Sequence, residues 1–252
     1  MSAAPVAIVT AAAGAGIGAA VVRELARDGW DVVVTDEHER RCSELANELA
    51  REHRRPFLAM PLDVTDFDAV GRVVAGVMDQ RGRIDGLVNN AGWNKIEPIV
   101  EMEPTTWRRC LDVDLTGTFH CLRHVLPVMV AAGRGAVVNM ASIAAWETSE
   151  EHGGAYSAAK AGVIALTRVA AAEVGRSGVR VNAIAPGLIY NDFLRKIYPD
   201  EFFASYAERR SLVGRVGQPQ DVASLAGFLL SDRAGYITGE VYGVSGGVAP
   251  LA

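Results

Sequence analysis

The chain has 252 residues, of which 50% are hydrophobic and 22% charged, and a formal net charge of −5. This composition suits one large or two small globular domains, and the acidic balance argues against nucleic-acid binding, which usually goes with a basic surplus. The N-terminus lacks the charged start and the long apolar run of a signal peptide, and no apolar run is long enough to span a membrane. We therefore expect a cytoplasmic protein that binds neither membranes nor nucleic acids.

Apolar runs rich in Val and Ile alternate with helical patterns along the chain. The expected strands are 6–10, 31–35, 57–60, 84–88, 136–140, 179–184 and 237–244. The expected helices are 17–28, 39–52, 66–80, 104–131, 155–175 and 219–231, the fourth bent near Pro127. Such alternation predicts parallel βαβ units, so we expect residues 1–252 to form a single doubly wound α/β domain, with a seven-stranded, mostly parallel sheet and helices on both faces.

The alternation breaks between residues 188 and 216, where the pattern predicts an inserted pair of short helices. In doubly wound folds ligands bind outside the carboxyl ends of the strands, and this insertion follows the sixth strand at that edge. We interpret it as a lid or substrate wall. Its aromatic side chains are those of Tyr190, Phe193, Tyr198, Phe202, Phe203 and Tyr206.

The cysteines and histidines do not form a metal-binding pattern. Cys42, Cys110 and Cys121 are odd in number and lack metal-ligand spacing, so we expect reduced thiols. His120 and His124 are four residues apart, but no third ligand stands near them. We expect no metal.

A glycine-rich turn follows the first strand. The strand ends at Thr10 and is followed by Gly14, Gly16 and Gly18. The next expected helix begins at Ile17. Glycine lets the backbone turn tightly and approach a ligand closely, and the first N–H groups of a helix attract phosphate. In this strand–turn–helix context the turn predicts a dinucleotide site.

Asp36 stands just after the second strand. A carboxylate at this place accepts hydrogen bonds from a ribose diol and repels a 2′-phosphate, so it favours NAD over NADP. Two alternatives stay open: Asp36 caps the next helix, or Arg40 and Arg41 make room for a phosphate.

Tyr156 and Lys160 are four residues apart in an expected helix and therefore share one face. An ammonium beside a phenol favours the phenolate and pulls the tyrosine pKa down from about 10. Tyr156 is thus a candidate proton donor and acceptor, and Ser142 would hold the oxygen on which the proton moves. A Tyr-x-x-x-Lys pair also arises by chance, so its meaning depends on the rest of the chain.

Taken together, these motifs resemble the classical short-chain dehydrogenase/reductase family over essentially the whole chain. The motifs in chain order are the turn 10–18, Asp63-Val64, Asn89-Asn90-Ala91-Gly92, Ser142, Tyr156-x-x-x-Lys160 and Pro186-Gly187. The resemblance implies a Rossmann domain and hydride transfer between a nicotinamide cofactor and a secondary alcohol or ketone, with Tyr156 as acid and base.

The same resemblance implies the cofactor contacts. Lys160 is expected on the nicotinamide ribose, close to Tyr156, and Asp36 on the adenosine ribose. Asp63 and Val64 are expected at the adenine. Further contacts are expected from Thr10, Gly14, Gly16, Ile17, Gly18, Asn90, Ala91, Gly92, Pro186, Gly187 and Ile189.

Three positions depart from the family pattern. Ala11 replaces the first glycine of the turn, which is one residue longer before Gly16. Asp114 stands where the family has the asparagine of a proton relay, and Asn191 replaces a common threonine. Aspartate accepts hydrogen bonds but cannot donate them, and it adds a charge near Lys160.

The substrate pocket is expected to include Ser142, Trp93, Trp146 and Tyr190. The chain is similar to family members that act on 3-oxoacyl thioesters and cyclic acyl-CoA compounds, including reductases of steroid-ring breakdown. This favours an alcohol or ketone on an apolar acyl or ring skeleton, with a CoA thioester as one option. The alternatives are a sugar or polyol dehydrogenase, a non-catalytic dinucleotide sensor, and an epimerase or dehydratase on a related fold.

The expected assembly is a homotetramer, which the resemblance implies. The helix 155–175 carries the small residues Ala158, Ala159, Gly162 and Ala165, which we expect to be exposed and to allow close helix packing. Self-complementary patches of this kind build closed two-fold assemblies.

Overall fold

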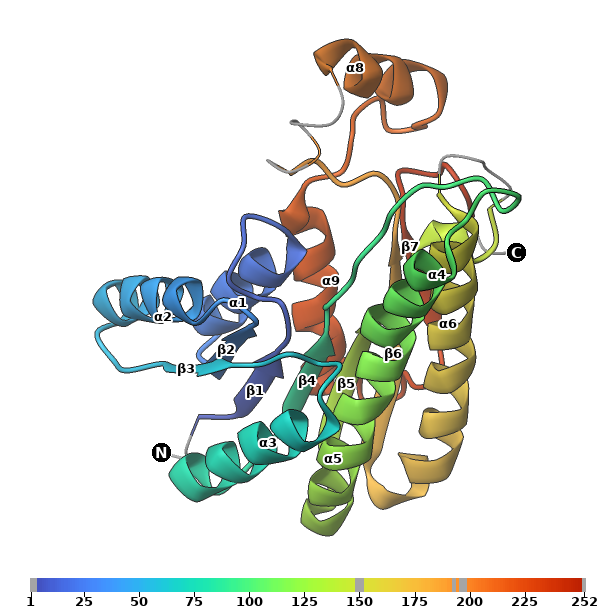
Figure 1. The fold of residues 1–252 in the computed structure, drawn as a ribbon. Helices are drawn as coiled ribbons and strands as arrows, with labels where there is room; N and C mark the ends of the chain where they lie inside the picture. The colour runs from blue at the N-terminus through green and yellow to red at the C-terminus, as the bar shows by residue number, and fades with distance from the viewer. Residues whose placement is uncertain (1–3, 148–151, 192–193, 195–198, 251–252) are drawn as a thin grey trace.

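The computed structural model describes residues 4–147, 152–191, 194 and 199–250. Its strands are β1 Val6–Val9, β2 Asp31–Asp36, β3 Leu58–Pro61, β4 Gly86–Asn89, β5 Gly135–Met140, β6 Val179–Pro186 and β7 Val241–Val244. They form one sheet in the order β3-β2-β1-β4-β5-β6-β7, and every neighbouring pair is parallel. The predicted doubly wound fold is confirmed (Figure 1).

Helices cover both faces of the sheet because each buries an apolar stripe against it. On one face lie α1 (Ile17–Arg27), α2 (Glu39–His53) and α9 (Pro219–Leu230), whose buried side chains share a core with β1 and β2. On the other lie α3 (Phe67–Arg81), α5 (Gly117–Ala132) and α6 (Gly154–Val174). Strands buried on both faces need continuous apolar runs, which explains the Val-rich pattern of the sequence.

The predicted helix 104–131 is wrong in its detail. It consists of α4 (Pro104–Leu111), a π-helical segment η1 (Asp112–Thr116) and α5. Pro127 lies inside α5, so the break comes earlier than the expected bend. The Thr118 hydroxyl donates a 2.8 Å hydrogen bond to the Asp114 carbonyl, which satisfies an acceptor in the widened turn. A π segment has no periodic signature, so the pattern did not reveal it.

Two further expectations are corrected by local geometry. The last strand begins at Val241 rather than 237, because Gly239 has a φ of 78° and interrupts the extended backbone. Among the small residues of α6, Ala159 is fully buried, and a Cβ on Gly162 would lie 2.8 Å from Leu115. Ala159 is therefore not available to a partner and Gly162 is half-buried, whereas Ala158 and Ala165 are exposed as expected.

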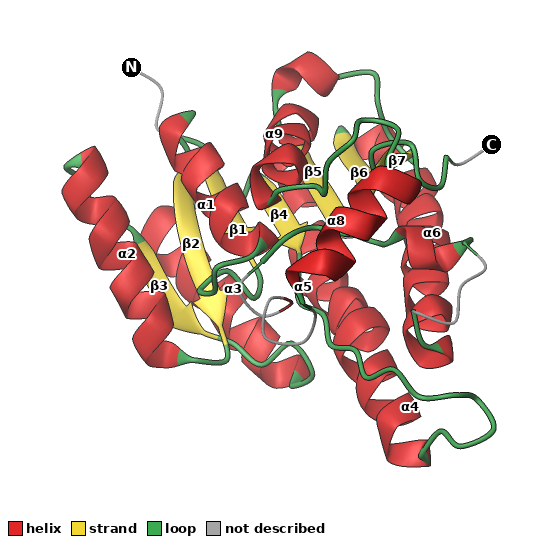
Figure 2. Cartoon of the chain, turned by 90° about the horizontal axis from the view of Figure 1, so that it is seen from above, coloured by secondary structure: helices red, strands yellow, loops and turns green. Residues whose placement is uncertain are grey.

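The segment 188–216 leaves and rejoins the main body at neighbouring points. Tyr190 N–H donates to the Gly217 carbonyl at 2.7 Å, and Gly217 N–H donates to the Leu188 carbonyl at 3.1 Å. Between these points runs α8 (Asp200–Arg209), which stands above the carboxyl edge of the sheet (Figures 1 and 2). Of the expected pair of short helices, the first falls largely outside the described residues, as do Phe193 and Tyr198.

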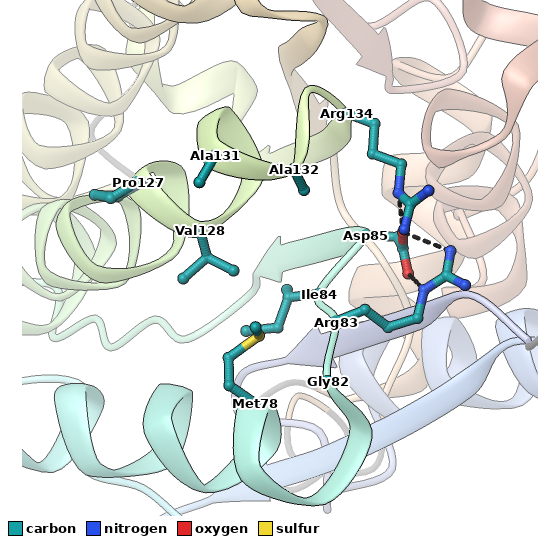
Figure 3. Close-up of a pocket in the computed structure, with 10 residues that line it drawn as sticks. All are labelled: Met78, Gly82, Arg83, Ile84, Asp85, Pro127, Val128, Ala131, Ala132 and Arg134. Carbon is teal, nitrogen blue, oxygen red and sulfur yellow. Dashed lines mark hydrogen bonds and ion pairs between the residues drawn. The ribbon is translucent and has the colours of Figure 1, made fainter.

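The opposite edge of the sheet is held by a buried carboxylate. Asp85 accepts hydrogen bonds from Val6 N–H at 2.9 Å, from Arg83 at 2.6 and 2.8 Å, and from Arg134 at 3.1 Å (Figure 3). Burial alone would raise the pKa of Asp85, but these donors hold it below its ordinary value. The hollow beside it, between α3 and α5, lies at the amino ends of the strands, away from the edge where ligands bind in this fold.

The turn before α1 offers a matched pair of glycines for a stability test. A Cβ on Gly18 would lie 2.5 Å from the Ala11 carbonyl oxygen and 2.6 Å from Asn90 Nδ2, whereas a Cβ on Gly16 would meet nothing within 4 Å. We expect Gly18→Ala to lower the free energy of unfolding by about 1–3 kcal/mol, the usual cost of overpacking. Gly16→Ala should change it by less than about 1 kcal/mol. Denaturant unfolding of both variants without ligand measures the difference, and equal losses would contradict the packing argument.

Candidate active site

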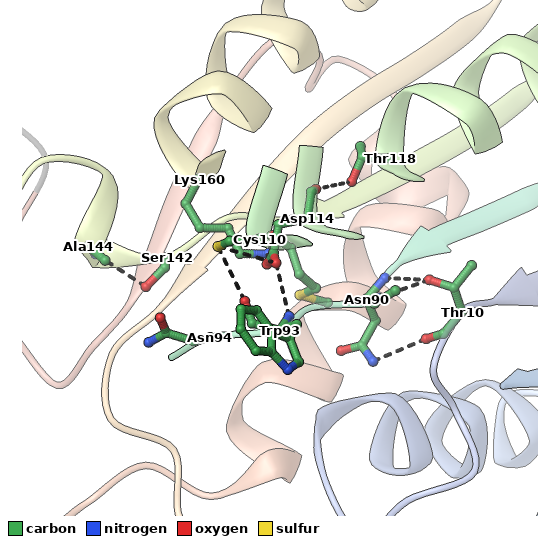
Figure 4. Close-up of polar contacts among 12 residues, drawn as sticks. Thr10, Asn90, Trp93, Asn94, Cys110, Asp114, Thr118, Ser142, Ala144 and Lys160 are labelled. Atoms are coloured by element: carbon green, nitrogen blue, oxygen red, sulfur yellow. Dashed lines mark hydrogen bonds and ion pairs between the residues drawn. The ribbon is translucent and has the colours of Figure 1, made fainter. Parts of the chain in front are cut away.

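The glycine-rich turn is tied to two strand ends. The Thr10 hydroxyl accepts hydrogen bonds from Asn90 N–H at 2.9 Å and Ala91 N–H at 3.0 Å. Asn90 Nδ2 donates to the carbonyls of Thr10 and Ala11, both at 3.1 Å. The turn after β1 is thereby fixed to the segment after β4, as Figure 4 shows for Thr10 and Asn90.

Ala11 adopts the conformation that the family glycine would allow. Its φ is 48°, in the left-handed region, which costs a non-glycine residue about 1–2 kcal/mol. The backbone path of the turn therefore survives the substitution at the expense of local strain.

The turn leaves a cradle open in front of α1. Gly16 is the residue before the first turn of the helix, and it has no side chain to block the free N–H groups behind it. A Cβ on Gly14 would likewise meet only a backbone nitrogen at 4.0 Å. Helix N–H groups behind an open glycine surface fit the pyrophosphate of a dinucleotide.

Asp36, at the end of β2, faces this cradle. Its Oδ2 accepts a 3.2 Å hydrogen bond from Ala13 N–H, and its Oδ1 accepts one of 3.1 Å from His38 N–H. The cap of α2 is His38, so the alternative that Asp36 caps this helix is wrong. The Arg40 guanidinium forms an ion pair with the Glu44 carboxylate, with 3.0 Å between nitrogen and oxygen. This contact argues against Arg40 as the partner of a 2′-phosphate.

The predicted adenine residues follow β3 at the same edge. Asp63 Oδ1 accepts hydrogen bonds from the backbone and hydroxyl of Thr65, at 2.8 and 2.7 Å. Val64 is buried against Gly117, and its carbonyl lies 2.9 Å from His120 Nδ1. This contact gives His120 a packing role.

Ser142, Tyr156 and Lys160 come together after β5 and at the start of α6. The Ser142 hydroxyl accepts a 3.2 Å hydrogen bond from Ala144 N–H and caps the short helix η2 (Ile143–Ala145). Lys160 Nζ lies 5.4 Å from the centre of the Tyr156 ring and donates to the Met140 carbonyl at 2.9 Å. The four-residue spacing on α6 therefore places phenol and ammonium side by side, as predicted.

Asp114 joins this group as a buried partner of Lys160. Its Oδ1 lies 3.0 Å from Lys160 Nζ, and both side chains are almost completely buried, with exposed fractions of 0% and 4%. Its Oδ2 accepts a 2.9 Å hydrogen bond from Trp93 N–H. Figure 4 shows Asp114 between Lys160 and Trp93.

The electrostatics differ from the simple expectation. Burial of the phenol raises the pKa of Tyr156 above its ordinary value; Lys160 and a hydrogen bond with Ser142 lower it, while Asp114 adds to the rise. Burial would lower the pKa of Lys160, but Asp114 and Tyr156 hold it above its ordinary value. Lys160 therefore lowers the pKa of Tyr156, as predicted, but without ligand the effect of burial is larger.

The residues expected at the nicotinamide lie beside β7. Pro186 ends β6, Gly187 N–H donates to the Val244 carbonyl at 3.0 Å, and a Cβ on Gly187 would lie 3.0 Å from Ser245. Ile189 is buried where the segment 188–216 begins. Asn191 Oδ1 accepts a 2.9 Å hydrogen bond from Leu194 N–H, so it stabilises its own loop.

The expected substrate residues are held by different contacts. The Trp93 ring packs under Arg109, with the guanidinium 5.1 Å from the ring centre. Trp146 Nε1 donates to the Ala249 carbonyl at 3.2 Å. Tyr190 packs edge-on against Phe203 with ring centres 5.2 Å apart, inside an apolar cluster of the segment 188–216.

One ionic cluster beside Ser142 was not predicted from the sequence. Glu147 Oε2 lies 2.9 Å from His152 Nε2, and Glu147 Oε1 pairs with Arg210 at the end of α8. One carboxylate thus links the loop after Ser142, the start of α6 and the segment 188–216. The partners are far apart in sequence, so no motif or spacing could have revealed them.

Two general observations bear on the chemistry. Within the residues described here, no group of three or more His, Cys, Asp or Glu side chains is placed to hold a metal ion. No helix in that part of the chain is both long and apolar enough to cross a membrane.

Comparison with known proteins gives matches over nearly the whole chain. A family model described as enoyl-(acyl carrier protein) reductase matches residues 11–249. The chain is 41% identical over 243 residues to (5R,7aS)-5-hydroxy-7a-methyl-1-oxo-2,3,5,6,7,7a-hexahydro-1H-indene-carboxyl-CoA reductase of Mycobacterium tuberculosis, covering 95% of this chain and 91% of that protein. It is 40% identical over 246 residues to cis-4-hydroxycyclohexanecarboxylate dehydrogenase of Sinomonas cyclohexanicum, covering 96% and 95%.

A solved structure extends the comparison to a sugar-directed enzyme. L-sorbose reductase of Gluconobacter frateurii, complexed with NADPH and L-sorbose, superposes with a TM-score of 0.90 at 29% identity, covering 99% of this chain and 98% of that one. Sequence motifs, fold and relatives agree: the chain belongs to the classical short-chain dehydrogenase/reductase family and is an oxidoreductase.

Proposed function

We propose that this enzyme interconverts a secondary alcohol and a ketone on an apolar acyl or cyclic skeleton, with NAD(H) as cofactor and Tyr156 as the proton-transfer group. The observation that carries the proposal is the meeting of Ser142, Tyr156 and Lys160 beside the open glycine cradle. A bound nicotinamide supplies the hydride or accepts it.

The side chains divide the remaining work. Ser142 holds the substrate oxygen, and Tyr156 gives that oxygen a proton in ketone reduction or takes one in alcohol oxidation. Lys160 orients the cofactor ribose and stabilises the phenolate form. We propose the same cofactor contacts as were expected from the sequence, because the elements that carry these residues meet at one edge of the sheet.

The proposed substrate class rests on relatives and on pocket character. The two curated relatives are named for ring compounds that carry an acid or a CoA thioester. We propose that Trp93, Trp146 and Tyr190 supply aromatic surface to the substrate pocket, and that the segment 188–216 closes over this pocket as a lid. Within that segment, Phe203 and Tyr206 are used for its own packing.

A sugar or polyol substrate is the second candidate, supported by the likeness to L-sorbose reductase. A non-catalytic sensor is disfavoured, because it has no need for Ser142, Tyr156 and Lys160 in one place. The same comparison includes an NADPH complex, so the choice of NAD rests on Asp36 alone.

We further propose a homotetramer in the cytoplasm. Large apolar side chains stay exposed on the helices that flank α6 and on α6 itself: Trp107 on α4, Phe119 on α5 and Val169 on α6. Such a patch is the kind of surface that two-fold assemblies bury. Light scattering that gave a stable monomer at micromolar concentration would contradict the assembly.

Tyr156→Phe tests the catalytic role. Removing the hydroxyl eliminates the proton donor, so we expect kcat to fall by about 10² or more, the scale of general acid–base catalysis, with cofactor affinity largely kept. Steady-state NADH absorbance and fluorescence titration of the cofactor measure the two effects. Tyr236→Phe is the matched control, because Tyr236 is fully exposed. A near wild-type rate in Tyr156→Phe would refute the proposed chemistry.

Cofactor choice is tested by comparing kcat/KM for NAD(H) and NADP(H). Two negative charges about 4 Å apart at an effective dielectric near 20 repel by roughly 4 kcal/mol before screening, so we expect a clear NAD preference. Asp36→Asn should lower the ratio of kcat/KM for NAD(H) to kcat/KM for NADP(H) by about tenfold or more. Glu37→Gln, a neighbouring and largely exposed carboxylate, should leave it unchanged. Equal wild-type values for both cofactors would overturn the assignment.

Substrate class is tested with matched ketones. We expect an apolar cyclic ketone to be reduced with a higher kcat/KM than small polar sugars, because the proposed substrate residues Trp93, Trp146 and Tyr190 are aromatic. The same cyclic ketone is assayed as free acid and as CoA thioester, and a gain from CoA would support the thioester option. A strong preference for sugars or polyols would instead support the second candidate.

A further inference from the structure

The charge of Lys160 is matched, inside the site, by a carboxylate of the same chain. Asp114 and Lys160 form an ion pair with 3.0 Å between Oδ1 and Nζ, and both are buried. Lys160 Nζ also donates to the Met140 carbonyl. A buried ammonium needs such partners, because burial of an unpaired charge is very unfavourable.

The carboxylate is held in place from three sides. Trp93 N–H donates to its second oxygen at 2.9 Å, and the π-helical segment η1 fixes its backbone. A Cβ on Gly92 would lie 3.0 Å from Asp114 Oδ1 and 3.6 Å from Lys160 Nζ, so the ion pair lies directly against this glycine. Asp114 therefore has little freedom to turn away from Lys160.

The phenol of Tyr156 is next to this pair. Among the described residues, the titratable groups that act on it are Lys160 on its own helix, Asp114 on η1 and Cys110 on α4. Burial raises the pKa of the Cys110 thiol to about 12, so this group stays neutral. The electrostatic balance at the phenol is thus between one ammonium and one carboxylate.

We propose that Asp114 is a positioning residue that compensates the charge of Lys160 and so keeps Tyr156 protonated, which sets the site for ketone reduction at neutral pH. The inference rests on the proposed function of Tyr156. In reduction, hydride brings an electron pair to the carbonyl carbon, the C=O π bond becomes a lone pair on oxygen, and the Tyr156 proton goes to that oxygen. The phenolate left behind regains a proton from solvent. Alcohol oxidation requires the phenolate from the start, so it demands a higher pH.

The direction of the effect follows from charge. Without the carboxylate, the phenolate of Tyr156 is the remaining anionic partner of the Lys160 ammonium, so the ammonium–phenolate pair is favoured and Tyr156 loses its proton at a lower pH. Alcohol oxidation then becomes active at a lower pH. Ketone reduction loses activity at a lower pH than in the wild type, because it needs protonated Tyr156. A merely structural role of Asp114 would change rates without moving these limits.

Asp114→Asn is the decisive variant, and Asp112→Asn is its control. The two substitutions make the same chemical change in the same segment, but the Asp112 side chain is exposed and Asp114 is fully buried. Asparagine keeps an oxygen that can accept the Trp93 hydrogen bond. Two readouts are needed: pH profiles of kcat/KM in both directions, and ultraviolet titration of tyrosinate in protein without cofactor. The signal of Tyr156 is isolated by subtracting the titration of the Tyr156→Phe counterpart.

We expect Asp114→Asn to lower the midpoint pH of the Tyr156 titration by about one pH unit or more. The pH at which the rate of alcohol oxidation rises should fall by the same amount. Asp112→Asn should leave both unchanged. An active Asp114→Asn enzyme with wild-type titration would overturn the inference and leave the proposed function intact, whereas an active Tyr156→Phe enzyme would overturn both. If Asp114→Asn does not fold, Asp114→Ser, which also removes the charge, takes its place in the same difference titration: a Tyr156 midpoint at least about one pH unit below that of the wild type supports the inference, and an unchanged midpoint refutes it.

Discussion

Parallel strand pairing throughout one sheet governs the organisation of this enzyme. Because every neighbouring pair of strands is parallel, all carboxyl ends meet at one edge, and the segments that follow them are brought together there. Thr10, Asp36, Asn90 and Ser142 are far apart in the sequence but follow β1, β2, β4 and β5. At the opposite edge, hydrogen bonds of Asp85 with Val6 N–H and two arginines fix the strand starts.

Close packing at this edge depends on where a side chain is missing. Gly18 and Gly92 leave room for other protein atoms: the backbone of the turn in one case, and the buried ion pair in the other. Gly14 and Gly16 leave room that no protein atom fills, in front of a helix N-terminus. The same residue type thus has two purposes, internal packing and ligand approach, and only the neighbours distinguish them.

The proposed catalytic centre combines burial with a compensated charge. A family asparagine would contribute no charge, whereas Asp114 forms an ion pair with the lysine that acts on Tyr156. The departure is accommodated because the π-helical segment directs the carboxylate inward, and Trp93 N–H donates a hydrogen bond to its second oxygen. In this arrangement the proton affinity of Tyr156 depends on a residue 42 positions earlier in the chain, from Asp114 to Tyr156.

The sequence by itself determined the alternation of strands and helices, the glycine turn, Asp36 and the Tyr156–Lys160 pair, because these are encoded in local periodicity and spacing. It also showed that Asp114 departs from the family and adds a charge near Lys160, but the sequence did not show how closely the two groups pair. Tertiary structure alone decided that Asp114 faces Lys160, that burial outweighs the lysine at Tyr156, and that Glu147 links His152 to Arg210. These are contacts between elements distant in sequence, and their geometry depends on how the helices pack around the sheet.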